Sequence, residues 1–161
     1  MLALNFIEQA LKEYGDEVPS LCLLQALILT TFCQLSKGVC ERGWRLLGLC
    51  IRISSEKNLH LIDSEAPNAR VPTGRAELTR WCFDEERKRC WWAVWEMEFF
   101  ASTIRRCPTG IHWTQNKTFL PVDESYWFDQ RFHKSCFLQP NRRNGGKPWK
   151  RVGTTVFRLG S

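Results

Sequence analysis

The stretch that decides the fold is residues 81–105, which read W-C-F-D-E-E-R-K-R-C-W-W-A-V-W-E-M-E-F-F-A-S-T-I-R. Asp84 is a good N-cap residue, and the acidic residues after it suit the positive end of a helix dipole. Glu85 is placed to pair with Arg89 one turn later. An apolar stripe then recurs at helical spacing (Cys90, Val94, Met97, Ala101 and Ile104). We therefore predict a helix from Asp84 to about Arg105.

The same helix carries a second apolar stripe, formed by Trp92, Trp95 and Phe99 on the opposite side. A helix that is apolar on two opposed faces lies between layers of a fold rather than on its surface. These three residues are the candidate face for a ligand or a protein partner. The simpler alternative is that they are core residues, as large aromatic side chains usually are.

Three further helices are expected before this one. Leu4, Ile7, Leu11 and Tyr14 form one stripe of a helix over residues 2–14. Ser20 is the N-cap of a second helix that extends to about residue 36, and a third runs from Val39 to about Asn58. Gly43 and Gly48 lie inside the third helix, where glycine costs about 1 kcal/mol against alanine, so we expect close helix approach at both.

The remaining segments show no helical period. Residues 63–80 contain two prolines and a glycine and predict a long loop, and residues 111–123 predict an extended segment. Together these patterns predict an all-α fold, an irregular bundle of about four main helices. The expected domains are a partial helical regulatory domain over residues 1–124 and a basic, poorly ordered tail over residues 125–161.

The net charge of +6 is unevenly distributed. Residues 1–130 hold 15 Lys and Arg against 17 Asp and Glu, whereas residues 131–161 hold eight basic residues and no acidic one. The body is therefore no basic nucleic-acid-binding domain. The tail interleaves aromatic residues with basic ones that are candidates for contacting nucleic acid or acidic partners, although a solvated terminus is the simpler interpretation. These basic residues are Arg142, Arg143, Lys147, Lys150 and Arg151.

The eight cysteines and three histidines prompt a test for zinc and for catalysis. Structural zinc sites use close pairs such as C-x-x-C, and no two cysteines here lie closer than seven residues. Most cysteines fall on apolar helix faces, where we expect buried thiols. No nucleophile, phosphate-loop or metalloprotease motif occurs. We therefore expect no metal, no cofactor and no enzymatic activity in this chain.

Residues 18–36 contain no charged side chain and are nearly long enough to cross a bilayer. Two glutamines, two threonines and two serines dilute the apolar run. We therefore favour a buried bundle helix, with a membrane anchor as the alternative.

Several stretches, taken in order, resemble the fungal-specific transcription factor domain, the middle homology region of fungal zinc-cluster regulators. They are G-W-R-L-L-G-L-C-I-R-I-S-S-E-K-N-L-H-L, W-C-F-D-E-E-R-K-R-C-W-W-A-V-W-E-M-E-F-F-A-S, R-C-P-T-G-I and L-P-V-D-E, and the resemblance covers about residues 19–124. It implies an all-helical regulatory module in the nucleus that modulates DNA-templated transcription. Its implied partners are the transcriptional machinery or other proteins and a small-molecule effector.

The chain departs from that family in two ways. The six-cysteine zinc cluster that binds DNA is absent, so zinc and DNA binding are expected only through a separate region. The family's helical domain normally continues past the proline-aspartate exit, where a basic tail follows here, so we expect a fragment or truncated gene model. Loss of covering helices would expose Trp92, Trp95 and Phe99 and favour self-association. The alternative function is a standalone helical interaction module with a basic tail.

Overall fold

The computed structural model describes residues 2–64 and 71–138, and these residues form helices and connecting segments without a β-strand. This confirms the all-α prediction. The elements in chain order are α1 (Leu2–Tyr14), α2 (Leu21–Leu35), α3 (Glu41–Glu56), the 3-10 turn η1 (Leu59–Leu61), α4 (Arg75–Arg105), the 3-10 turn η2 (Trp113–Gln115) and α5 (Glu124–Phe128).

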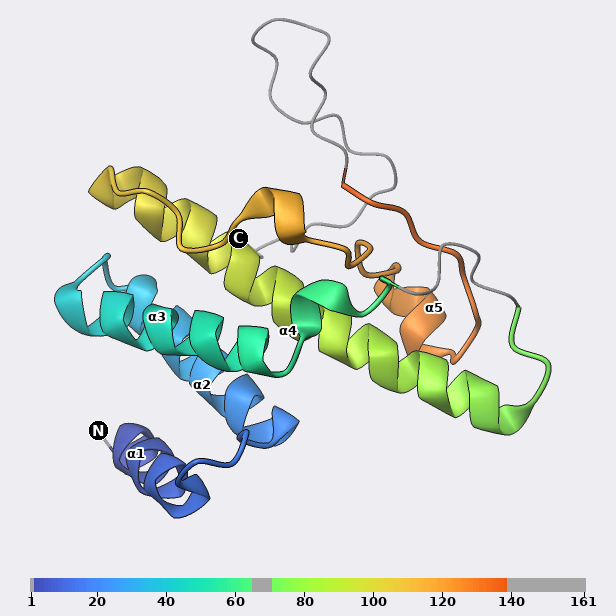
Figure 1. Cartoon of the computed structure of the whole chain (residues 1–161), viewed down its shortest axis with the longest axis horizontal. Helices are drawn as coiled ribbons and strands as arrows, with labels where there is room; N and C mark the ends of the chain where they lie inside the picture. The colour runs from blue at the N-terminus through green and yellow to red at the C-terminus, as the bar shows by residue number, and fades with distance from the viewer. Residues whose placement is uncertain (1, 65–70, 139–161) are drawn as a thin grey trace, which may run out of the picture.

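Helix α4 is the axis of the molecule (Figure 1). Helices α2 and α3 pack against each other and against α4, and α1 packs on α2. On the other side of α4, the chain after residue 106 runs back toward the N-terminal part of α4, where α5 lies (Figure 1). The first turns of α4 extend past the ends of α2 and α3, and we call residues 75–85 the overhang.

Local sequence explains where the first helices begin and end. The Ser20 hydroxyl accepts a hydrogen bond from the Leu23 N–H at 3.2 Å, as predicted for an N-cap. Gly15 after α1 adopts a φ of +55°, which glycine reaches without steric cost. Asn58 after α3 adopts a φ of +54°, a conformation that asparagine tolerates better than most residues. Both residues lie within two positions of the helix ends that the sequence predicted.

The two glycines of α3 have different roles. A Cβ on Gly43 would lie 3.1 Å from Leu35 Cδ2, so Gly43 allows the close approach of α2 and α3 that we predicted. A Cβ on Gly48 would meet only Arg52 of its own helix, at 3.6 Å. The predicted close approach at Gly48 is therefore wrong.

The apolar core lies between α2, α3 and one face of α4. Leu24, Leu27, Leu47, Cys50 and Val94 are fully buried there. In the described part of the chain, no helix has the length and apolar character needed to cross a bilayer.

Helix α4 begins earlier than predicted. It starts at Arg75, inside the stretch expected to be a loop, because Gly74 ends the proline-containing part and Glu77 accepts hydrogen bonds from the Thr73 N–H and hydroxyl at 2.7 and 3.0 Å. Asp84 therefore lies inside the helix and is not its N-cap. The predicted Glu85–Arg89 pair is also wrong, because both side chains turn to other partners described below.

The chain continues to pack on α4 after residue 124. Helix α5 lies within the region predicted to be tail, and Trp81 of α4 meets Phe132 edge to face at 5.6 Å. Residues 125–138 are thus part of the packed body, and the remainder of the predicted tail, residues 139–161, lies outside the described residues.

Candidate functional site

The aromatic face of α4 is largely covered by the chain that follows it. Trp92 is 5% exposed, and its indole N–H donates to the Phe119 carbonyl at 2.6 Å. The Trp92 ring lies 5.3 Å from Trp95 and 6.2 Å from Trp113. Phe99, stacked on Trp95 at 5.7 Å, remains 47% exposed. Of the three candidate residues, Trp92 is therefore core, Trp95 half-buried and Phe99 accessible.

Residues 111–122, which we call the covering segment, are fixed in place by hydrogen bonds of buried and half-buried groups. The Trp91 indole N–H donates to the Asn116 side-chain oxygen at 3.0 Å. The Thr118 hydroxyl donates to the Leu59 carbonyl at 2.6 Å and accepts from the Ile62 N–H at 3.1 Å. These bonds join the covering segment to both α4 and η1.

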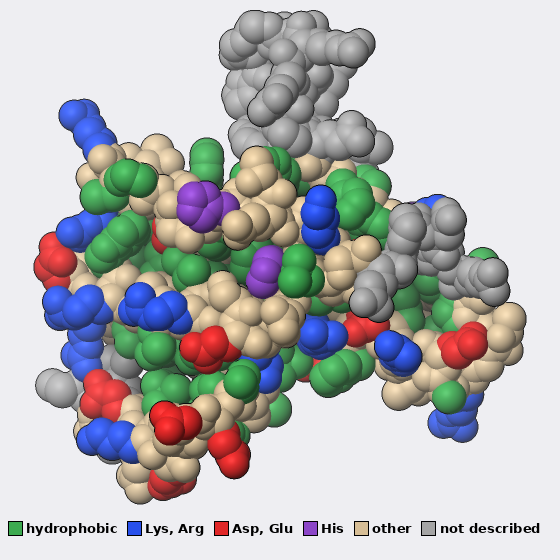
Figure 2. All heavy atoms as spheres, viewed as in Figure 1, with side chains coloured by type: hydrophobic (Ala, Val, Ile, Leu, Met, Phe, Trp, Pro, Cys, Tyr) green, Lys and Arg blue, Asp and Glu red, His purple; other side chains and the backbone are tan. Residues whose placement is uncertain are grey.

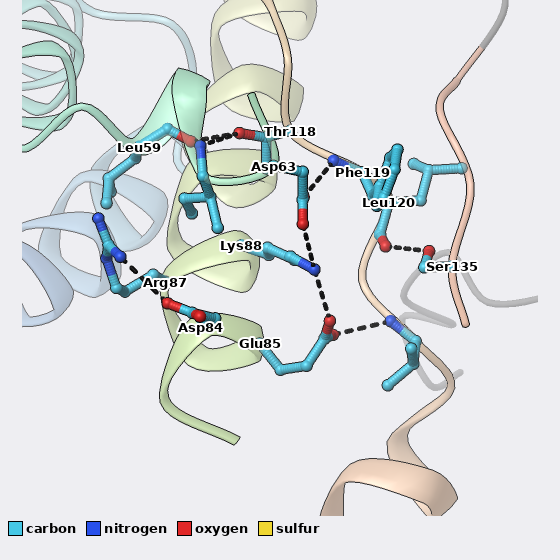
Figure 3. A network of polar contacts seen from close by, with 12 residues as sticks. Leu59, Asp63, Asp84, Glu85, Arg87, Lys88, Thr118, Phe119, Leu120 and Ser135 are labelled. Carbon is cyan, nitrogen blue, oxygen red and sulfur yellow. Dashed lines mark hydrogen bonds and ion pairs between the residues drawn. The ribbon is translucent and has the colours of Figure 1, made fainter. Parts of the chain in front are cut away.

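A buried group of three charges connects the same elements (Figure 3). Lys88 Nζ lies 3.1 Å from Asp63 Oδ1 and 3.0 Å from Glu85 Oε1. The other oxygens of the two carboxylates accept backbone N–H groups of the covering segment, from Phe119 to Asp63 at 2.8 Å and from Val122 to Glu85 at 3.0 Å. The side chains of Lys88, Asp63 and Glu85 are 7%, 11% and 1% exposed. Charges this deeply buried require such partners.

Arg89 attaches α5 to this arrangement. Its guanidinium donates to the Val122 carbonyl at 2.9 Å and lies 4.5 Å above the Trp127 ring. The Trp127 indole N–H donates in turn to the Cys82 carbonyl at 3.3 Å. Burial lowers the pKa of Arg89, and the negative charge of Glu85 opposes that shift.

A cavity of about 240 Å³ lies against the overhang, beside the buried charges. Asp63, Glu85 and Lys88 form part of its wall, and Phe119 of the covering segment contributes another part. Further lining comes from Pro72, from Glu77, Arg80, Trp81 and Asp84 of α4, and from residues 132–135. The cavity is therefore lined by aromatic rings and by charged side chains of both signs.

The chain matches a known protein family. Residues 3–151 match the fungal-specific transcription factor domain, and this region covers more than half of the chain.

The chain belongs to the fungal-specific transcription factor domain family.

The matched region extends beyond residues 19–124, on which the resemblance rested, in both directions. It includes the covering segment, α5 and residues 132–135, which line the cavity.

Curated relatives agree with this assignment. The chain is 25% identical over 121 residues to an uncharacterized transcriptional regulatory protein of Schizosaccharomyces pombe. It is 27% identical over 108 residues to the tropolone cluster transcription factor tropK of Talaromyces stipitatus, and 30% identical over 103 residues to the C6 finger domain transcription factor hasF of Aspergillus fumigatus. These alignments cover 73%, 67% and 64% of this chain but only 18%, 18% and 12% of the relatives. No solved structure matches the chain.

Sequence reasoning missed the charged residues of the site. Glu85 and Lys88 continue the stripe of Trp92, Trp95 and Phe99 toward the N-terminus at the same helical spacing. The spacing is visible in the sequence, but charged residues near the start of a helix more often lie in solvent, where they interact with the helix dipole. The basic candidates of the tail (Arg142, Arg143, Lys147, Lys150 and Arg151) lie outside the described residues.

The cysteines are less buried than predicted. Cys50 and Cys90 are buried, and burial raises the pKa of each thiol to about 11. Five others are exposed, on α2, next to a helix end or in the segment after α5 (Cys22, Cys33, Cys40, Cys107 and Cys136). Among the residues that the structure describes, no three His, Cys, Asp or Glu side chains form a group able to hold a metal ion.

Proposed function

We propose that this chain is the regulatory domain of a nuclear fungal zinc-cluster transcription factor, and that it modulates transcription without reading DNA and without catalysing a reaction. The observation that carries the proposal is the family match over residues 3–151. The relatives support it, since all three are named as transcription factors or a transcriptional regulatory protein, and one is named as a C6 finger protein. Zinc would be held by a separate cluster region and not by this domain.

The charge distribution of the described body is consistent with a role that does not contact DNA directly. On the face shown in Figure 2, acidic and basic side chains are interspersed over the helices. DNA-binding surfaces instead gather Lys and Arg on one side. The body would therefore act through protein partners, including the transcriptional machinery, and through a small effector.

Of the face of Trp92, Trp95 and Phe99 that the sequence suggested for a partner, only the end at Phe99 is accessible. Trp92 is too deeply buried to contact another molecule, whereas Phe99 is 47% exposed. The neighbouring Phe100 and Ile104 are 52% and 55% exposed. The C-terminal end of α4 is thus the part of that face that a partner protein could cover.

A reporter assay tests this function. The full chain is fused to an unrelated DNA-binding domain, and transcription is measured from a promoter carrying that domain's site. We expect the fusion to change transcription at least about threefold relative to the DNA-binding domain alone, and Phe99→Ser to reduce that change. The control Phe6→Ser alters an exposed phenylalanine on α1, 71% exposed, and should have no effect. A fusion that leaves transcription unchanged, at equal protein level, contradicts the proposal.

A second candidate function rests on the basic tail. Residues 131–161 carry eight basic and no acidic residues, so a tail that binds nucleic acid or an acidic partner is the alternative. Fluorescence anisotropy with duplex DNA at several salt concentrations measures such binding. Glutamine at the five basic candidates named above should weaken binding and flatten its salt dependence. Equal binding by the substituted chain would exclude this function.

A further inference from the structure

Helix α2 is apolar on its outer face as well as on its core face. Leu24 and Leu27 are fully buried in the core. On the other side of the helix, Leu29 and Phe32 remain 66% and 45% exposed. Residues 21–35 contain no charged side chain. Because a helix that is apolar on all sides is ordinarily buried on all sides, the outer face of α2 is suited to a partner.

The polar groups of this face are already satisfied within α2. The Thr30 hydroxyl donates to the Ala26 carbonyl at 2.8 Å, and the Ser36 hydroxyl donates to the Cys33 carbonyl at 3.1 Å. Covering these hydroxyls would therefore leave no donor without an acceptor. The outer face of α3 differs, because it presents exposed charges such as Arg45. The complementary partner for α2 is thus an apolar, uncharged surface.

The exposed residues of α2 follow the spacing of a coiled-coil seam. Four of them recur at intervals of four, three and four, and they are Cys22, Ala26, Leu29 and Cys33. Positions 22 and 33 are equally far from the midpoint of this stripe, and so are positions 26 and 29. If a second α2 lies antiparallel across the stripe, a twofold axis through the midpoint places Leu29 of one copy opposite Ala26 of the other. A large side chain then meets a small one, which allows the two helices to interdigitate.

We propose that two copies of this chain associate through their α2 helices, packed antiparallel about a twofold axis. The stripe complements itself in size, and because it is uncharged, a second copy brings no like charge against it. The antiparallel arrangement also sets the positive end of each helix dipole beside the negative end of the other. A contact of one helix per copy belongs to the small interfaces, below about 1,200 Å² in total. The dimer should therefore form reversibly, with a dissociation constant on the order of 10 µM.

Sedimentation velocity of the full chain from about 1 to 200 µM tests the association. We expect the average mass to rise from monomer toward dimer, and Leu29→Glu to weaken association at least tenfold, because two carboxylates would be buried near the axis. The matched control is Phe128→Glu, at a phenylalanine of α5 that is 71% exposed, and it should leave association unchanged. Thermal unfolding at about 1 µM, where the monomer predominates, should be the same for the parent and Leu29→Glu, so that misfolding does not explain the loss.

Oxidation with copper-phenanthroline tests the antiparallel pairing. This pairing places Cys22 of one copy opposite Cys33 of the other, so the two thiols can be oxidised to a disulfide, which a non-reducing gel detects as a linked dimer. Cys22→Ser and Cys33→Ser should each prevent the link, since the remaining cysteines of the two copies would lie about 16 Å apart along the helices. Cys136→Ser, at another exposed cysteine, should leave the link unchanged.

Several results would overturn the proposal. They are a chain that remains monomeric up to about 200 µM, whether or not it binds neutral lipid vesicles, equal association of the Leu29→Glu and Phe128→Glu variants, and linked dimers that survive in both serine variants. The outer face of α2 does not include Phe99, at which the reporter assay is directed. Association can therefore be found where the transcription assay fails, and the reverse also holds.

Discussion

Helix α4 is held by two different kinds of contact on its two faces. The face toward α2 and α3 is apolar, and Cys90, Val94, Met97 and Ala101 are buried there. The face toward the covering segment is held by indole N–H groups and by the buried charges around Lys88. Apolar packing tolerates many sequences of similar volume, whereas a buried charge requires its specific partners. The covering segment should therefore be the more vulnerable of the two attachments to single substitutions.

The largest effect is expected at Lys88. Lys88→Met leaves the carboxylates of Asp63 and Glu85 buried without their cation, and loss of one partner of a buried ion pair costs about 3–5 kcal/mol. Urea unfolding of the full chain should show this loss. Lys37→Met, at an exposed lysine after α2, is the matched control and should change the free energy of unfolding by less than about 0.5 kcal/mol. A loss at Lys88 no greater than the control would contradict the role of the charged group.

The apolar face should respond somewhat less. Leu47 of α3 is fully buried in the core, and Leu47→Ala should cost about 3 kcal/mol, through lost burial and the cavity left behind. Leu29→Ala, at a leucine of α2 that is 66% exposed, should be close to neutral. Equal unfolding free energies for the two variants would show that this side of α4 is not the core.

A smaller effect is expected where the covering segment meets Trp92. Trp92→Phe keeps most of the ring but removes the N–H donor to Phe119, and the unpaired buried carbonyl should cost about 1–3 kcal/mol. Hydrogen exchange should then become faster for amides of residues 116–122 and remain unchanged in α2. Uniform acceleration in both regions would show that the two faces of α4 open as one unit.

The smallest effects concern the glycines of α3. Gly48→Ala should stabilise the chain by about 0.5–1 kcal/mol, because alanine is the better helix former and the added Cβ meets only Arg52. Gly43→Ala should lose that gain, since its Cβ would lie 3.1 Å from Leu35. Thermal unfolding of the two variants measures the difference. The same change in both would mean that α2 and α3 do not approach closely at Gly43.

The difference between the two faces also explains what the sequence could predict. Apolar residues that recur every three or four positions predicted α1 to α3 and the buried stripe of α4. The sequence did not predict the start of α4 at Arg75. The prolines and Gly74 before it indicate a loop, and the exposed first turn has no apolar stripe that would indicate a helix. Asp63 lies 25 positions before Lys88, and no local spacing relates the two residues. The Phe119 and Val122 N–H donors are backbone groups, which carry no sequence signal at all.

The overhang gives α4 the geometry of a lever. Gln25 of α2 donates to Glu86 at 2.7 Å, at the residue that follows the overhang. We take this bond as the point about which α4 would rotate. At 1.5 Å per residue, the arm toward Arg75 is about 16 Å long and the arm toward Arg105 about 29 Å. If α4 pivoted there as a rigid rod, a movement at Arg75 would be multiplied about 1.3-fold at Phe100 and about 1.6-fold at Ile104. A movement at one end of α4 would thus be transmitted to the surface at its other end.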